Sequence, residues 1–258
     1  MMRPKSLYKY QPFTVEAISN LKNHRIWFSK PAAFNDPYDC AIRIDAGAIP
    51  EDDFERLFQR FREKYQEKGL DPAGFDQKYL THGLVNDLFK DMVRSSIKKA
   101  FEDRRQVMLS QRGVSCFSEC RDQMLMWSHY ARGHRGFCLE FDTSTQAFNR
   151  VFQVQYSETI PSVNPASVLL EKSDKAFWSM ITVKAACWSY EKEWRIFHME
   201  PDKTYGVGAE ALRAVYFGAA MESTHKEIIA MILRDSPTKL YELTIKDTEF
   251  RLDCSPFR

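Results

Sequence analysis

The sequence predicts an α+β fold built around a mixed β-sheet, and three observations support this prediction. The chain opens with a strand, a helix and a second strand; later strands follow with few helices between them; and two amphipathic helical segments lie together between about residues 50 and 110. A regular alternation of strands and helices would instead predict a doubly wound parallel sheet. We expect one domain over residues 1–258, with a helical insertion at about 50–110.

The first forty residues predict the opening elements. A short strand is expected at 7–10, and Thr14 then has the residue type and position of an N-cap for the helix that follows. A second strand is expected at 25–29. Prolines and an Asn-Asp-Pro sequence predict an irregular loop over 31–39, because such side chains bond to their own backbone.

The insertion is predicted from its apolar periodicity. Helical spacing over 51–65 places one apolar face along that segment, and Gly69 is a suitable helix end. A second helix is expected from about 84 to 107. Neither segment carries a recognisable catalytic motif.

The remaining elements follow from alternation and turn signals. A short helix is expected around Trp127, ending at Gly133. Strands are expected at 114–118, 137–141, 151–156, 191–197 and 214–218, helices at about 167–186 and 223–234, and a terminal hairpin at 239–245 and 249–254.

Composition excludes several classes of protein. The 37 basic and 35 acidic residues give a net charge of +2, so there is no global field to attract nucleic acid or a membrane surface. The N-terminal MMRPKSLYKY is polar, and no apolar run approaches the roughly 20 residues of a membrane helix. We therefore expect a cytoplasmic protein with no membrane partner. The six dispersed cysteines predict reduced thiols rather than a disulfide framework.

The segment EKEWR is the first candidate for chemistry. On a strand, alternation would place Glu191, Glu193 and Arg195 on one face. One interpretation is an exposed face on which Arg195 screens the two glutamates, worth about 0–1 kcal/mol. The other is a site that stabilises positive charge on a sugar. On that hypothesis, Glu193→Gln lowers activity by about 100-fold or more with little change in thermal stability.

Two other polar clusters are candidates. His129 closes the helix that contains Trp127 and Tyr130, and it is either a capping side chain or a catalytic one. Asn35 and Asp36 either rigidify their loop or bind a ligand there.

The sequence lacks several signatures of nucleotide-binding proteins and hydrolases. The sequence contains no phosphate-binding P-loop, dinucleotide-binding glycine motif, nucleophile elbow or zinc-binding HExxH. His129 and His134 lack paired metal-ligand spacing with Cys116 and Cys120, so no metal site is predicted. Cys116 with His129 is a further candidate nucleophile pair, although the apolar neighbours of Cys116 favour a buried thiol.

Several motifs together resemble an uncharacterised bacterial family. They are LYKY (7–10), IWFSKPAAFNDPYD (26–39), CFSE (116–119), MWSHYARGHRGFCLEFD (126–142) and YEKEWRIF (190–197). In this order they resemble a domain of unknown function that is similar to phage-resistance proteins of the AbiG abortive-infection type. The resemblance implies a role in phage defence.

A more distant resemblance is to ADP-ribosyltransferases, whose core has a polar first strand, a strand bearing a serine and a Glu-x-Glu strand. It implies that NAD is the substrate and that Glu193 stabilises the oxocarbenium-like transition state while Glu191 orients a protein or nucleic-acid acceptor. Ser29 would support Glu193. Tyr8 or Tyr10 would bound the NAD pocket, and Lys9 stands where the best-known classes have Arg or His.

The leading hypothesis is therefore ADP-ribosyl transfer or NAD glycohydrolysis, with Glu193, Glu191 and His129 as catalytic candidates. The candidate binding residues are Tyr8, Lys9, Tyr10, Ser29, Asn35, Asp36, Trp127, Tyr130 and Arg195. The alternatives are a metal-dependent hydrolase or nuclease built on Asp36, Asp39, His129 and Glu193, and a non-catalytic module that binds a ligand on an aromatic surface. If one site exists, the segments 7–10, 26–39, 126–136 and 190–195 should meet in space.

Overall fold

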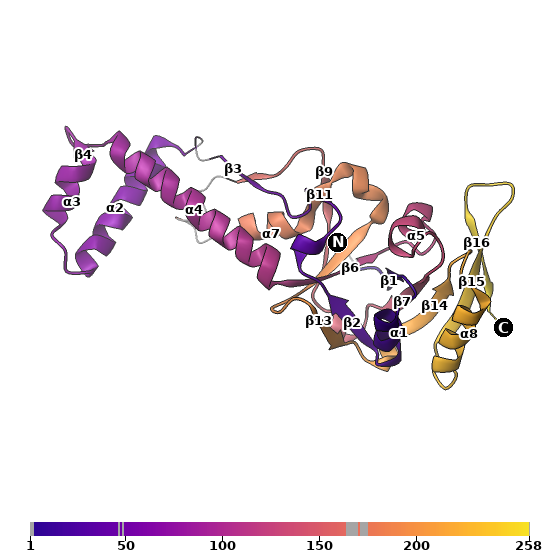
Figure 1. Cartoon of the computed structure of the whole chain (residues 1–258). Coiled ribbons are helices and arrows are strands. Elements are labelled where there is room, and N and C mark those ends of the chain that lie inside the picture. The colour runs from indigo at the N-terminus through magenta and orange to yellow at the C-terminus, as the bar shows by residue number, and fades with distance from the viewer. Residues whose placement is uncertain (1–2, 46, 48, 164–169, 171–174, 258) are drawn as a thin grey trace.

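The computed structural model describes residues 3–45, 47, 49–163, 170 and 175–257, and these form the predicted α+β fold (Figure 1). The described residues build an eight-stranded mixed sheet and several two-stranded ones. Only β14 and β15 run parallel among the neighbouring strands of the large sheet; the other described pairs are antiparallel. In sheet order the strands are β16 (Leu252–Pro256), β15 (Lys239–Ile245), β14 (Leu212–Phe217), β7 (Phe137–Asp142), β1 (Ser6–Gln11), β6 (Gly113–Ser118), β12 (Glu193–His198) and β8 (Val151–Gln153).

The opening of the chain agrees with the prediction. Helix α1 (Val15–Lys22) begins after Thr14, whose hydroxyl accepts a hydrogen bond from the Ala17 backbone N–H at 3.2 Å. Strand β2 (Arg25–Phe28) pairs with β13 (Lys203–Gly206). The expected irregular loop contains a 3₁₀ turn, η1 (Pro31–Ala33).

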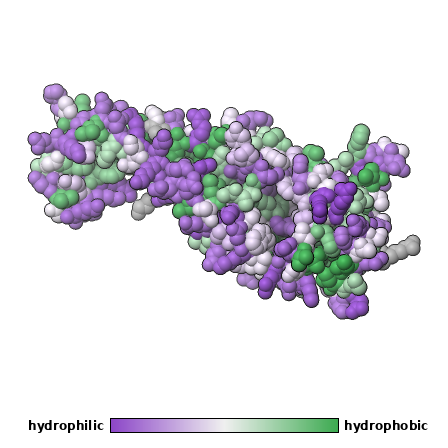
Figure 2. Space-filling view, viewed as in Figure 1, coloured by the Kyte–Doolittle hydropathy of each residue, from purple (hydrophilic) through white to green (hydrophobic). Residues whose placement is uncertain are grey.

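The helical insertion forms an arm that extends away from the sheet (Figure 1). It contains α2 (Glu51–Glu67), α3 (Pro72–Tyr79) and α4 (Asp87–Gln111), together with the short strands β4 (Leu80–Thr81) and β5 (Leu84–Val85); the short strand β3 (Arg43–Ile44) precedes it. The prediction missed α3 and began the last helix at 84. That helix begins later because Asn86 caps it, its side chain accepting from the Phe89 N–H. The arm has an aromatic core of its own and a largely hydrophilic surface (Figure 2).

Besides the unpredicted strand β13, the second half of the chain departs from the prediction in three places that bear on the site. The strand expected at 151–156 is divided, because the Val154 N–H bonds to the Glu193 carbonyl and β9 (Gln155–Ser157) turns to pair with β11 (Val183–Ala185). The helix expected over 167–186 appears as α7 (Lys175–Thr182). Its expected beginning falls on 167–169 and 171–174, which lie outside the described residues, and its end is replaced by β11.

The third departure is at the EKEWR segment. The 3₁₀ helix η3 (Ala186–Glu191) runs through Glu191, and Lys192 adopts a left-handed conformation with φ 44°. Strand β12 therefore starts only at Glu193, so the expected alternation holds for Glu193 and Arg195 but does not include Glu191.

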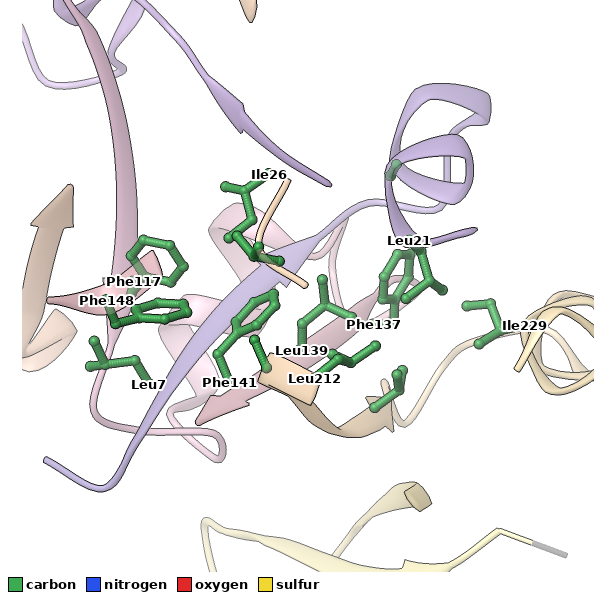
Figure 3. Close-up of a cluster of buried hydrophobic side chains, with 14 of the residues drawn as sticks. Leu7, Leu21, Ile26, Phe117, Phe137, Leu139, Phe141, Phe148, Leu212 and Ile229 are labelled. Atoms are coloured by element: carbon green, nitrogen blue, oxygen red, sulfur yellow. The ribbon is translucent and has the colours of Figure 1, made fainter. Parts of the chain in front are cut away.

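The remaining elements are short. They are the helices α5 (Met124–Tyr130) and α8 (Ser223–Ile232), the 3₁₀ turns η2 (Gln146–Phe148) and η4 (Ala209–Ala211), and β10 (Ser162–Val163), which pairs with β3. Both faces of the large sheet are covered. Figure 3 shows one core cluster, in which Leu7, Phe137 and Phe141 pack with Leu21 of α1 and Ile229 of α8. A second cluster contains Tyr10, Trp127 and Tyr216.

The sheet opens between two of its central strands. Strand β1 pairs with β7 over its whole length, from Ser6 to Gln11, but in the described part of the chain it pairs with β6 only where Tyr8 faces Ser118. Beyond Tyr8 the two strands separate, and this gap positions the site described next. Within the described residues, no helix is long and apolar enough to cross a membrane.

Candidate active site

A cavity of about 930 Å³ lies where β1 and β6 separate. The four segments expected to meet all contribute to its wall, so their convergence is confirmed. Residues from these segments on the wall include Tyr8, Lys9, Tyr10, Ser29, Asn35, Asp39, His129, Tyr130, Glu191 and Glu193, and Lys184 joins them.

Arg195 of β12 is the centre of a buried ion network beside this cavity. Its guanidinium forks onto the Asp39 carboxylate, with Nη1–Oδ1 at 2.8 Å and Nη2–Oδ2 at 2.7 Å. Its Nε also donates to Glu193 Oε1 at 2.7 Å. Because Arg195 is 0% and Glu193 3% exposed, the interpretation of EKEWR as an exposed, solvent-screened strand face is wrong.

Lys184 is the second cation of the network. Its Nζ lies 2.6 Å from Glu191 Oε2, 3.0 Å from Glu193 Oε2 and 3.7 Å from Asp39 Oδ2. The sequence-based prediction missed it, because β11 was expected to be the end of a helix. A signal was present: Lys184 is a lone charge within the apolar run ITVKAACW, and such a residue is rarely buried without a partner.

The two glutamates differ in their electrostatic surroundings. Burial raises the pKa of Glu193, but Arg195 and Lys184 outweigh it and lower the pKa to about 2. For Glu191, burial dominates and raises the pKa, with Lys184 opposing and Glu193 adding to the rise. Glu193 is therefore a firmly ionised carboxylate, whereas Glu191 is the one that protonates more easily.

A tyrosine binds each glutamate, at the carboxylate of Glu191 and at the backbone of Glu193. The Tyr130 hydroxyl of α5 donates to Glu191 Oε1 at 2.7 Å, and the Asn35 side-chain amide donates to the same hydroxyl at 3.5 Å. The Tyr156 hydroxyl accepts from the Glu193 backbone N–H at 2.8 Å. His129 is exposed at the edge of this cluster, where its ring contacts Tyr130 and Trp188 edge-on.

Other predicted residues lie elsewhere. Trp127 is fully buried in the core and does not line the cavity; its Nε1 donates to the Arg121 carbonyl. Asp36 is also absent from the cavity wall, and its Oδ1 accepts from the Tyr38 N–H within the loop. Arg195 does not line the cavity either; it forms ion pairs with Asp39 and Glu193, which do.

The resemblance implies that Ser29 supports Glu193 and that Tyr8 or Tyr10 bounds the pocket. Ser29 lines the cavity, but the residue opposite Glu193 in the sheet is Ser118, whose hydroxyl donates to the Glu191 carbonyl at 2.6 Å. Tyr10 lines the cavity while its hydroxyl is bound to the Cys120 carbonyl at 2.7 Å.

The alternative chemistries gain no support from the geometry. Burial raises the pKa of the Cys116 thiol well above its ordinary value, which disfavours a nucleophilic thiolate. All six cysteines are free thiols. Across the described ranges, no group of three or more His, Cys, Asp or Glu side chains is arranged to hold a metal ion. Asp39 and Glu193, which the metal-dependent alternative requires, are instead paired with Arg195 and Lys184.

Comparison with known proteins assigns a family model to part of this region. Residues 126–196 match the model described as "Protein of unknown function (DUF2971)", and this segment contains Tyr130, Lys184, Glu191, Glu193 and Arg195. No curated protein and no solved structure matches the chain. The similarity thus supports a domain of unknown function, and Asp39 reaches the network from outside the matched segment.

Proposed function

We propose that this protein binds NAD in the cavity and cleaves the bond between nicotinamide and ribose, as an ADP-ribosyltransferase or an NAD glycohydrolase. The observation that supports the proposal is a pair of buried carboxylates, Glu191 and Glu193, on the wall of one aromatic-lined cavity. A cavity of about 930 Å³ is within the range of small-molecule sites. Breaking a glycosidic bond develops positive charge on the sugar, which a nearby carboxylate stabilises.

The charge balance indicates which carboxylate would act. Among the described residues that are joined by ion pairs here, the carboxylates Asp39, Glu191 and Glu193 outnumber the cations Lys184 and Arg195 by one when all are ionised. Glu193 has both oxygens bound to cations, whereas Glu191 has one oxygen on Lys184 and the other on the neutral Tyr130 hydroxyl. In our proposal, Glu191 therefore faces the reacting ribose, and Glu193 holds Lys184 and Arg195 in place.

The reaction follows from these roles. The bond from the ribose anomeric carbon to the nicotinamide nitrogen breaks, and its electron pair leaves with nicotinamide, which becomes neutral. The oxygen of water or of an acceptor then bonds to the carbon, and its proton passes to the Glu191 carboxylate. His129, exposed beside Tyr130, is proposed to contact the acceptor. The resemblance to abortive-infection proteins adds a role in phage defence to this proposal.

The test is release of nicotinamide from NAD by the purified protein, followed by chromatography, with and without added protein and nucleic-acid acceptors. Glu191→Gln is the matched variant, because it keeps the shape of the side chain and removes its charge. We expect release by the wild type and a loss of about 100-fold or more in the variant. No release by the wild type in any of these mixtures would refute the proposal.

A further inference from the structure

Strand β16 is an open edge of the large sheet. It is the last strand in the sheet order, and it lies at the opposite end of the molecule from the helical arm (Figure 1). Its side chains from Asp253 to Pro256 are all exposed. At the other end of the sheet, β8 is a shorter strand with no exposed residue. Because an open edge presents unpaired backbone groups to solvent, β16 is where this sheet can accept a further strand.

The backbone groups that β16 leaves unpaired follow from its pairing with β15. Just beyond the end of β16, the Phe257 N–H donates to the Leu240 carbonyl at 2.9 Å. Backbone groups alternate in direction along an antiparallel strand, so the odd-numbered residues of β16 bond to β15 and the even-numbered residues point outward. Proline has no N–H. The outward groups are therefore the carbonyls of all the even-numbered residues and the N–H groups of the first two, which are Leu252, Cys254 and Pro256.

These outward groups are complementary to those of a second copy of the same strand. The middle residue of β16 is Cys254, and an antiparallel copy centred there pairs the whole strand with itself. In this alignment the Cys254 residues of both copies exchange their backbone hydrogen bonds, and the Leu252 N–H of each copy meets the Pro256 carbonyl of the other. The missing N–H of Pro256 falls at the end of the pairing, where a strand tolerates proline. Such self-complementarity is what a two-fold interface requires.

The side chains of β16 also suit this alignment. Asp253 of one copy lies opposite Ser255 of the other. Arg251 lies opposite Phe257, so no like charges face each other directly. Arg251 can keep the ion pair with Asp253 of its own chain, in which the two atoms are 3.6 Å apart. The antiparallel alignment also brings the hairpin turn with Phe250, a 100% exposed side chain, beside the end of β16 in the second copy.

We propose that two copies of this protein associate through β16, as an antiparallel strand pair centred on Cys254. The two large sheets then form one continuous sheet across a two-fold axis. Among the described strands each copy has one such edge, so the association ends at a dimer. Two short strands form a small interface, so the dimer dissociates on dilution. No residue of β16 lines the cavity, and the inference does not depend on the proposed activity.

Sedimentation velocity of the full chain under reducing conditions, over about 1 to 500 µM, measures this association. Cys254→Pro removes an outward N–H and leaves the backbone bonds to β15 in place. Cys254→Ser is the matched control, because it keeps that N–H. We expect the wild type and Cys254→Ser to dimerise equally, and Cys254→Pro to dimerise more weakly by about tenfold or more.

The register of the pairing is tested at Ser255, which faces Asp253 of the second copy. Ser255→Asp places like charges opposite each other, and Ser255→Lys places opposite charges there. At low salt we expect the first to weaken the dimer and the second to strengthen it, each by about threefold or more. Because Ser255 is exposed, these variants also test the proposal if Cys254→Pro does not fold.

A wild type that sediments as a monomer at every concentration would overturn the inference. A dimer of unchanged affinity in folded Cys254→Pro would do the same, since another surface would then hold the two copies together. Equal effects of Ser255→Asp and Ser255→Lys would reject the alignment centred on Cys254.

Discussion

Two arginines of this protein each form a bidentate ion pair with an aspartate, one buried and one partly exposed. In the sheet, Arg195 grips both oxygens of Asp39, and the side chains are 0% and 3% exposed. In the helical arm, Arg62 grips both oxygens of Asp76 at 2.7 and 2.9 Å, and these side chains are 35% and 29% exposed. Both pairs are bidentate, through Nη1 and Nη2 of Arg195 and through Nε and Nη2 of Arg62, but only the Arg62 pair is partly exposed to solvent.

The comparison shows that burial, rather than hydrogen-bond geometry, decides what an ion pair does. Water screens the charges of the arm and would solvate either partner if the other were lost. In the sheet no water replaces a lost partner, so each charge constrains the next, from Asp39 through Arg195 to Glu193. An extended buried network of this kind is a means of fixing side chains beside a cavity.

The largest effect is expected from Arg195→Met. The substitution leaves Asp39 and Glu193 buried with Lys184 as the only cation of the described residues within 4 Å of them, and we expect the free energy of unfolding to fall by about 3–5 kcal/mol. Urea denaturation measures it, with Arg234→Met as the control because that side chain is 79% exposed. A loss below about 1 kcal/mol would show that the network is not the constraint described here.

The second largest loss of stability is expected from Glu193→Gln. Its folded-state pKa of about 2 is below the ordinary value of 4.5, so ionised Glu193 stabilises the fold above about pH 4.5, and this contribution is lost as the pH falls towards 2. The difference corresponds to about 3 kcal/mol, in contrast to the small stability change predicted from the sequence. Urea denaturation between pH 7 and pH 3 should show the gap between wild type and variant narrowing. Glu191→Gln is the matched control, because the raised pKa of Glu191 predicts a smaller loss or a gain.

Tyr130→Phe is expected to have a smaller effect. It removes the hydroxyl that donates to Glu191, which should lower the free energy of unfolding by about 1–2 kcal/mol. Because that hydrogen bond lowers the pKa of Glu191, its loss should raise this pKa further and move the acidic limb of the activity profile to higher pH. Tyr38→Phe, at an exposed tyrosine, should change neither quantity. An unaltered pH profile in Tyr130→Phe would argue against Glu191 as the titrating group.

Arg62→Met should have the smallest effect. The pair with Asp76 lies at the surface, so we expect unfolding in urea to be unchanged within error, at low salt and at high salt alike. A loss comparable to that of Arg195→Met would mean that fork geometry, and not burial, sets the strength of these pairs.

The sequence predicted those parts of the fold that depend on local signals. Thr14 as an N-cap, the helix from Glu51 and the terminal hairpin all follow from periodicity and turn residues close to them in the chain, although the second hairpin strand lies at 252–256 and not at 249–254. The divided strand at Val154 did not follow, because that division depends on a hydrogen bond to Glu193.

The sequence predicted the outline of the candidate site. The features that it did not predict depend, like the division at Val154, on contacts between segments that are distant in the chain. Glu193 and Arg195 were found from alternation on one strand, but Glu191 reaches Lys184 through the left-handed turn at Lys192, which no spacing rule indicates. In the loop over 31–39, Asp39 and not Asp36 enters the network, and only the position of Arg195 distinguishes these two neighbouring aspartates.

The bridge between Ser29 and Val114 has a consequence for how this protein can vary. Their backbones exchange two hydrogen bonds, of 3.1 and 2.8 Å, so the chain leaves the sheet at Ser29 and returns beside the same residue at Val114. The pairing of Ser29 with Val114 closes the long loop between these two residues. The entropic cost of closing a loop grows only slowly with its length. The outer helices α2 and α3 can therefore be exchanged, extended or shortened, provided that the segment up to Ile44 and the end of α4 around Met108, which pack against the rest of the protein, stay in place. The outer part of the arm can therefore vary while the sheet that carries the cavity stays the same.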